Sequence, residues 1–147
     1  MTSSYLVFTL AGRLFGARLS GAIEILTHRQ TRRVPLSYSY VEGLIDYRGA
    51  IYPVFNIAQR LGISAPTPIG FAAPVRDTGG QSIILLEERK IQFGILVDSV
   101  ARMAKLDDPA GADAQAKGID SKYLKGVVLD DDQEILILDF ERLLHAG

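Results

Sequence analysis

The chain has 147 residues and no cysteine, and 48% of its residues are hydrophobic. This length fits one domain, or two small lobes sharing a chain, and the composition is typical of folded proteins rather than disordered ones. Without cysteine, a disulfide framework, a thiolate nucleophile and a cysteine metal site are excluded. No apolar run reaches the roughly 18 residues of a membrane helix, so we expect a cytoplasmic protein with no direct membrane insertion.

Charge is distributed unevenly along the chain, although the net charge is only −1. Residues 1–75 carry seven arginines against three acidic side chains, which gives +4, whereas residues 76–147 carry nine basic and fourteen acidic side chains, which gives −5. Such polarity suits contacts with proteins of complementary charge. The isoelectric point near 6.1 argues against nucleic acid as a partner, because nucleic-acid-binding domains are usually basic.

Two β-hairpins are predicted in the first half of the chain. Apolar residues 5–10 and 15–19 flank the first turn. Apolar residues 44–45 and 50–55 flank the tetrapeptide Asp46-Tyr47-Arg48-Gly49, in which Gly49 is free to adopt a positive φ.

A short helix follows these hairpins. Asn56 is a good N-cap for a helix over residues 57–61, and Gly62 is suited to end it. Residues 64–80 contain three of the six prolines and are predicted to form a linker or an exposed loop.

The second half repeats the same order of features. A hairpin is predicted over residues 83–97, and a loop over residues 107–120. The triplet Asp130-Asp131-Asp132 then predicts the tip of a second hairpin. Asp139 is the expected N-cap of a helix over residues 140–144.

The chain is therefore an internal duplication. The matched positions are Phe15-Gly16 and Phe93-Gly94, Tyr40 and Tyr123, Gly43 and Gly126, Phe55 and Leu138, Asn56 and Asp139, and Leu61 and Leu144. Short strands with tight turns, written twice, predict an all-β protein of two five-stranded barrels with a short helix after each. We expect the first lobe at about 12–65 and the second at about 81–140, with terminal segments crossing between them. A small barrel has little interior, so a binding site is expected in the groove between lobes.

No constellation of residues predicts catalysis or metal binding. The two histidines are His28, in a polar run that predicts a surface position, and His145, two residues from the C-terminus. No nucleophile elbow or phosphate-binding loop is present. The aspartates of the Asp130-Asp131-Asp132 triplet lack the spacing, glycine and distant glutamate of a calcium loop, so a solvated turn is expected. We predict no enzymatic activity, no metal and no cofactor.

The tip of the 44–55 hairpin differs from its repeat in chemistry. The second copy fills its tip with aspartates, whereas the first copy places Tyr47 beside Arg48. Tyrosine and arginine are both enriched at the energetic centres of protein interfaces. The sequence leaves two interpretations equally open: a contact with another protein, or an arginine paired to Asp46, Glu42 or the other lobe.

Four segments carry a resemblance to a known family. They are FTLAGRLFGARLSGAIEIL, VEGLIDYRGAIYPVFNIAQRLG, FGILVDSVARM and YLKGVVLDDDQEILILDFERLL. In this order and spacing they resemble the CheW-like chemotaxis coupling (adaptor) proteins, over nearly the whole chain from Tyr5 to Leu144. The strongest pattern is Gly43, an apolar pair, Asp46, any residue and Arg48-Gly49, followed by proline between apolar residues.

The resemblance implies two intertwined SH3-like barrels without catalysis. It further implies a cytoplasmic adaptor that bridges the regulatory domain of a CheA-type histidine kinase to the cytoplasmic tip of a methyl-accepting chemoreceptor, and that joins membrane receptor arrays through these partners. The receptor-binding residues that it implies are Ala22, Glu24, Tyr47, Arg48, Ile83, Val100 and Met103. On the first barrel, Gly43 and Ile45 are implied to lie nearest the kinase.

Other functions remain open alongside this one. The hairpin tip commonly reads Asn-Leu-Arg-Gly in the family, so Asp46 and Tyr47 leave the receptor open and fit a coupling protein for a pilus or another non-flagellar output. A regulatory or small-ligand-sensing double barrel with a single protein partner is a second alternative. A barrel that stacks oligonucleotide bases on Tyr38, Tyr40, Tyr47 and Tyr52 is a third, although Asp46 and Glu42 interrupt the positive charge that such a face needs.

Overall fold

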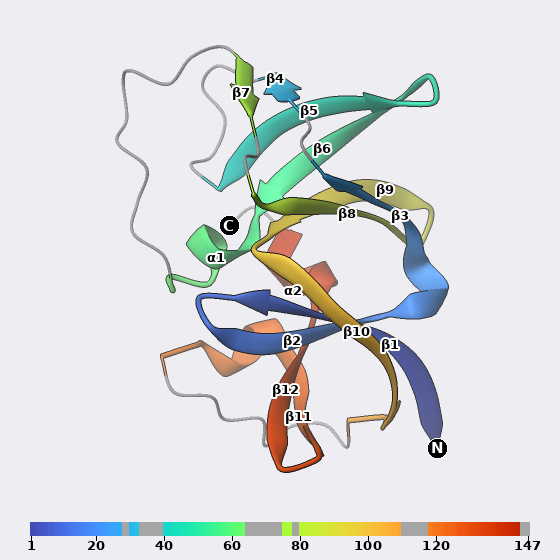
Figure 1. Cartoon of the computed structure of the whole chain (residues 1–147), viewed down its shortest axis with the longest axis vertical. Helices are drawn as coiled ribbons and strands as arrows, with labels where there is room; N and C mark the ends of the chain where they lie inside the picture. Colours follow the sequence, from blue (N-terminus) through green and yellow to red (C-terminus); the bar gives the residue numbers. More distant parts are fainter. Residues whose placement is uncertain (28–29, 33–39, 64–74, 78–79, 110–117, 145–147) are drawn as a thin grey trace.

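The computed structural model describes residues 1–27, 30–32, 40–63, 75–77, 80–109 and 118–144 (Figure 1). The elements in chain order are β1 (Thr2–Leu10), β2 (Arg13–Arg18), η1 (Leu19–Gly21), β3 (Ala22–Thr27), β4 (Gln30–Arg32), β5 (Val41–Tyr47), β6 (Ala50–Asn56), α1 (Ile57–Arg60), β7 (Val75–Asp77), β8 (Ser82–Glu88), β9 (Ile91–Val97), β10 (Ser99–Asp107), η2 (Ser121–Tyr123), β11 (Leu124–Asp130), β12 (Gln133–Leu138) and α2 (Phe140–Leu144). His28, Tyr38, His145 and most of the expected linker 64–80 lie outside the described residues.

The strands form two sheets, which confirms the predicted all-β class. Sheet A has five strands in the order β10-β1-β2-β12-β11, and sheet B has seven in the order β3-β8-β9-β6-β5-β4-β7. We call the halves of the molecule built on them lobe A and lobe B; lobe A lies below lobe B in Figure 1. The short strands β4 and β7 pair with each other and extend sheet B beyond the five strands expected. Strand β7 lies in the segment that the sequence predicts as a linker.

The two halves of the sequence exchange their first hairpins. The β1–β2 hairpin of the first half joins sheet A through a parallel pairing of β2 with β12. The β8–β9 hairpin of the second half joins sheet B through a parallel pairing of β9 with β6. The expected ranges 12–65 and 81–140 therefore each contribute strands to both sheets, and neither range is a lobe on its own.

The turns confirm the duplication residue by residue. Arg48 and Gly49 have φ of 52° and 82°, and the matched Asp131 and Asp132 have 49° and 62°. The first hairpins of the two halves also turn on two residues with positive φ, at 11–12 and at 89–90. Two-residue turns of this kind match the right-handed twist of the strands that they join.

The exchanged hairpins are buried on both faces, which explains their continuous apolar runs. On β8, Ile83 and Leu85 face the interior of lobe B, whereas the alternating Ile84 and Leu86 face a large cluster between the lobes. Strand β1 has the same arrangement, with Tyr5 and Val7 inside lobe A and Leu6, Phe8 and Leu10 in the inter-lobe cluster. The two lobes therefore share the large inter-lobe cluster, and each lobe has an apolar interior of its own.

The repeated Phe-Gly pair has a packing cause. Phe15 and Phe93 are buried in the inter-lobe cluster. The glycine that follows each of them faces a barrel interior with no room for a side chain. A Cβ on Gly16 would lie 2.9 Å from Ile137 Cδ1, and a Cβ on Gly94 would lie 3.1 Å from Ile83 Cγ2.

Both predicted helix caps are confirmed. Asn56 Oδ1 accepts a hydrogen bond from the Gln59 amide at 3.1 Å, and Asp139 Oδ1 accepts one from the Arg142 amide at 3.2 Å. Each capping residue also donates its own amide to the carbonyl of a matched tyrosine: Asn56 to Tyr40 at 2.7 Å, and Asp139 to Tyr123 at 2.8 Å.

Arg60 connects the two helical segments. Its guanidinium carbon lies 4.7 Å from the centre of the Tyr40 ring and 5.2 Å from that of the Tyr123 ring. Its Nε donates a hydrogen bond to the Leu143 carbonyl at 2.9 Å. The arginine therefore joins α1, which follows sheet B, to α2, which follows sheet A.

Candidate partner-binding surface

Glu24, Tyr47 and Arg48 come together at one end of lobe B. Glu24 lies on β3, the strand at one edge of sheet B. Tyr47 is the last residue of β5, which is four places from β3 in the strand order, and Arg48 begins the turn after β5. The Tyr47 hydroxyl donates a hydrogen bond to Glu24 Oε2 at 3.1 Å. The Arg48 guanidinium carbon lies 5.3 Å from the centre of the Tyr47 ring. The hydrogen bond therefore links β3 with the end of β5, two strands that do not pair in the sheet.

The Arg48 guanidinium is exposed and is held by the Tyr47 ring rather than by a carboxylate. The candidate partner Asp46 is used within the turn, where its Oδ1 accepts a hydrogen bond from the Gly49 amide at 3.1 Å. Within the described part of the chain, Arg48 forms no ion pair. The interpretation that Asp46 or Glu42 neutralises this arginine is therefore wrong for the described residues.

The hydrogen bonds at this tip shift both titratable groups. The pKa of Glu24 is lowered below its ordinary value by two hydrogen bonds. The larger effect comes from the Ile25 amide, which donates to Glu24 Oε1 at 3.1 Å, and the next from the Tyr47 hydroxyl. Desolvation, followed by the hydrogen bond to Glu24, raises the pKa of Tyr47. At neutral pH the tip therefore presents an ionised carboxylate and a neutral phenol beside the guanidinium.

Ala22, Val100 and Met103 lie on the outermost strands of the two sheets. Ala22 is on β3 and the other two are on β10, which are repeat-related strands at the edges of sheets B and A. Ala22 and Val100 are half-buried and pack against the same inter-lobe cluster. Met103 is 67% exposed, so its apolar side chain is accessible to a partner.

Three other residues implied by the resemblance are not on the surface. Ile83 is 0% exposed and belongs to the interior of lobe B, so it supports β3 from beneath and cannot contact a partner in this conformation. Ile45 is also in that interior, and Gly43 is buried because β4 lies over it. A Cβ on Gly43 would lie 2.5 Å from the Arg32 carbonyl oxygen, which is why only glycine fits there.

The sequence analysis missed exposed apolar residues next to these buried ones. Leu44 is 36% exposed and Ile51 is 59% exposed. In the β5–β6 register, Leu44 lies opposite Pro53 and Ile51 opposite Asp46, so both side chains are on the outer face, away from Ile45. The alternation of apolar residues in the hairpin could have located them, since the residues between inward positions must point outward.

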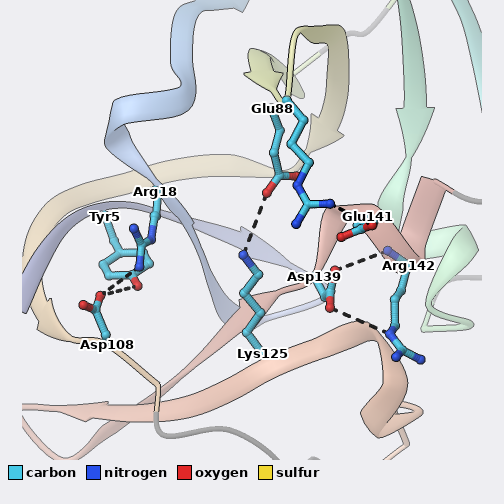
Figure 2. A network of polar contacts seen from close by, with 9 residues as sticks. Tyr5, Arg18, Glu88, Asp108, Lys125, Asp139, Glu141 and Arg142 are labelled. Carbon is cyan, nitrogen blue, oxygen red and sulfur yellow. Dashed lines mark hydrogen bonds and ion pairs between the residues drawn. The ribbon is translucent and has the colours of Figure 1, made fainter.

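A band of charged contacts crosses from one lobe to the other (Figure 2). Glu88 of sheet B pairs with Lys125 of sheet A at 3.8 Å, and Arg89 pairs with Glu141 of α2 at 2.9 Å. These side chains surround three neighbouring hollows that share Phe140 as a lining residue. None of the residues implied by the resemblance lines these hollows.

A second polar cluster in Figure 2 ties β1 to the end of β10. The Tyr5 hydroxyl donates a hydrogen bond to Asp108 Oδ1 at 3.0 Å, and Arg18 pairs with the same oxygen at 3.4 Å. The Ser3 hydroxyl, and then Tyr5 and Arg18, lower the pKa of Asp108. Desolvation and the bond to Asp108 raise the pKa of Tyr5.

No group of three or more His, Asp or Glu side chains in the described ranges is placed to hold a metal ion. No helix of the described chain combines the length and apolar character needed to cross a bilayer. Tyr40 and Tyr52 are 8% and 3% exposed, so they form no stacking platform for bases.

Comparisons with known proteins agree with this architecture. The family model described as "CheW-like domain" matches residues 4–147. The chain is 28% identical over 141 residues to "Chemotaxis protein CheW" of Treponema pallidum (strain Nichols), covering 95% of this chain and 80% of that protein. It is 31% identical over 112 residues to "Chemotaxis protein CheW" of Thermotoga maritima, covering 76% of this chain and 68% of the relative.

A solved structure has the same fold. The crystal structure of the scaffolding protein TtCheW from Thermoanaerobacter tengcongensis superposes with a TM-score of 0.78 at 24% identity, covering 100% of this chain and 90% of that one. At this identity the likeness establishes the fold, and the prediction of two SH3-like lobes is confirmed.

Proposed function

Since the chain belongs to the CheW-like domain family, we propose that it is a non-enzymatic cytoplasmic adaptor that couples a methyl-accepting chemoreceptor to a CheA-type histidine kinase. The observation that carries the proposal is the exposed Arg48 guanidinium, which extends from a two-residue turn and has no ion-pair partner among the described residues. Arginine forms a planar fork of five donors that suits a carboxylate of another protein. A receptor helix is the partner that we assign to it.

The receptor surface in this proposal combines elements of both lobes. The polar end of this surface consists of Glu24, Tyr47 and Arg48. Its apolar area, on β3 and β10, consists of Ala22, Val100 and Met103. An amphipathic helix binds such a surface through its apolar face, with charged contacts setting the register. Ile83 lies beneath this surface as a support rather than within it.

The kinase contact in this proposal is on the outer face of lobe B. Gly43 and Ile45 are buried, so Leu44 and Ile51 are the apolar side chains that can reach a partner there. Changing either exposed residue to serine should weaken binding of the kinase regulatory domain, because apolar area at an interface centre carries much of the affinity. Receptor binding should be retained.

An adaptor of this kind works by holding two partners at once. Binding both on one rigid body raises their concentration relative to each other. It transmits a signal only where its contacts differ between the signalling states, a coupling typically worth about 1–3 kcal/mol. The inter-lobe cluster suits this role because it packs the two lobes against each other.

The test is the charge reversal Arg48→Glu, measured by titration against the tip fragment of a methyl-accepting receptor from the same genome. We expect at least a tenfold loss of affinity, while the circular dichroism spectrum and the kinase interaction stay unchanged. Lys90→Glu is the matched control, because it makes the same charge change in the two-residue turn of the β8–β9 hairpin. If Arg48→Glu binds the receptor as tightly as Lys90→Glu does, the proposed site is wrong.

One of the hollows beside Phe140 favours the second candidate function, a small-ligand sensor with a single protein partner. It has a volume of about 230 Å³ and is lined mainly by apolar side chains, among them Phe55, Phe93 and Leu144. A thermal-shift screen with single-ring aromatic compounds tests this candidate. Stabilisation of the protein, without binding to any receptor fragment, would favour the sensor over the adaptor.

A further inference from the structure

Tyr47 is packed on one side of its ring at the tip of lobe B. Its ring packs against the lobe B interior and lies edge-on to Tyr52, with the ring centres 6.3 Å apart. Tyr52 is only 3% exposed, so the ring that supports Tyr47 is itself fixed. This packing leaves the hydroxyl and the other ring face of Tyr47 for contacts with Glu24 and Arg48.

The hydroxyl and the ring face of Tyr47 contact groups of opposite charge. The hydroxyl donates to Glu24 Oε2, while the ring face carries the Arg48 guanidinium. A phenol can do both, because its O–H is a donor and its π-face is negative. A leucine side chain, which has neither a polar group nor a π-face, could do neither.

Glu24 and Arg48 are close enough to influence each other without touching. The positive charge of Arg48 contributes to lowering the pKa of Glu24, yet the described residues contain no ion pair between them. An ionised carboxylate offers about four lone-pair sites, and the amide of Ile25 and the hydroxyl of Tyr47 occupy two of them. Acceptor capacity on Glu24 and donor capacity on Arg48 both remain.

We propose that Tyr47 is a positioning residue that keeps Glu24 and Arg48 apart as two usable charges, and that this pair selects a partner helix carrying a carboxylate for Arg48 and a cationic side chain for Glu24. On a helix, an acid and a base three or four residues apart lie on one face, so one helical turn presents both charges. The inference rests on the proposed function for the identity of the partner as a receptor tip. The separation of the two charges is a property of the free protein.

The first experiment is carried out on the free protein and requires no receptor. The Glu24 side chain is followed by carbon-detected NMR titration in wild type, Tyr47→Phe and Tyr47→Leu. Tyr47→Phe loses the hydrogen bond, so Glu24 should titrate at higher pH than in wild type. In Tyr47→Leu the carboxylate should pair directly with Arg48, and its titration should become sensitive to salt. Identical Glu24 titrations in all three proteins would overturn the inference.

The second experiment measures binding to a receptor tip fragment by calorimetry. Tyr47→Phe should lose roughly two- to tenfold in affinity, the range of one ordinary hydrogen bond, and Tyr47→Leu should lose more. Asp130→Asn is the control at the repeat-equivalent position of lobe A, where it replaces the ion pair between Asp130 and Arg102, both in sheet A, by a neutral contact; it should bind as wild type. Equal affinity of wild type and Tyr47→Leu would overturn the selection.

A charge exchange tests the polarity of the selection. The double variant Glu24→Arg/Arg48→Glu is titrated against two receptor fragments, the natural one and one in which the acid and the base have been exchanged. It should bind the exchanged fragment more tightly than the natural one. Preference for the natural fragment would overturn the assigned polarity. If the wild-type protein binds no receptor fragment while the free-protein titrations behave as expected, the proposed function fails and the positioning role of Tyr47 stands.

Discussion

Replacing Arg60 with leucine should destabilise the protein by weakening the connection between α1 and α2. The change removes two ring contacts, at 4.7 Å and 5.2 Å, and the hydrogen bond to the Leu143 carbonyl. The rings of Tyr40 and Tyr123 are 8% and 9% exposed, so both cation–π contacts are partly shielded from water. Each is worth about 0.5–2 kcal/mol, and a hydrogen bond from a charged donor about 1.5–3 kcal/mol. Because one guanidinium makes all three contacts they are not additive, and we predict a loss of about 2–4 kcal/mol.

The assay is urea unfolding together with thermal melting, where this loss corresponds to roughly 5–15 °C for a chain of this size. Arg142→Leu is the matched control: it also removes a helical arginine, but that side chain is 65% exposed and lies 4.0 Å from Asp139. Such an exposed pair contributes little, so the control should change stability by less than about 0.5 kcal/mol. Equal effects of the two variants would refute the role assigned to Arg60.

Two further predictions concern packing and pH. Gly94→Ala should destabilise the protein by about 1–3 kcal/mol in urea unfolding, because the added Cβ would crowd Ile83. Gly80→Ala is the control and should have almost no effect, since a Cβ there meets nothing within 4 Å. The pKa of Asp108 is lowered in the folded state, chiefly by the Ser3 hydroxyl. The contribution of the ionised Asp108 to stability is therefore present above the unfolded-state pKa, and it disappears as the pH falls through the folded-state pKa. Unfolding measured from neutral to acidic pH should therefore show a smaller acid-dependent loss in Asp108→Asn than in wild type, and parallel curves would contradict this account.

Local chemistry in the sequence was sufficient to predict the turns and helix ends. The turn at Gly49 and the caps at Asn56 and Asp139 depend on residues within a few positions along the chain. The duplication added the correspondence of Tyr40 with Tyr123, which the structure confirms through equivalent backbone hydrogen bonds. Signals of this kind survive folding because tertiary contacts do not compete with them.

The exchange of hairpins could not be predicted from local patterns. An apolar run predicts a buried strand, and the runs at β1 and β8 are buried on both faces, but no residue in them specifies which sheet they join. The strands β4 and β7 have three residues each and carry too few side chains to show an alternation.

The candidate site was predicted only in part for a related reason. Glu24, Tyr47 and Arg48 meet because the barrel closes, which is a long-range contact. The resemblance supplied these residues, but it also supplied Ile83, Gly43 and Ile45, which are buried here. A family pattern marks positions near a site, and burial then decides which of them can touch a partner.

Simultaneous binding of two partners is the central claim, and a bridging experiment tests it most directly. An immobilised receptor tip fragment is incubated with the kinase regulatory domain, with and without this protein. The account predicts that the kinase domain is retained only when the protein is present, and that saturating amounts of the kinase domain do not release the protein from the receptor. Displacement of the protein from the receptor by the kinase domain would show that the two partners share one surface, and would contradict the account.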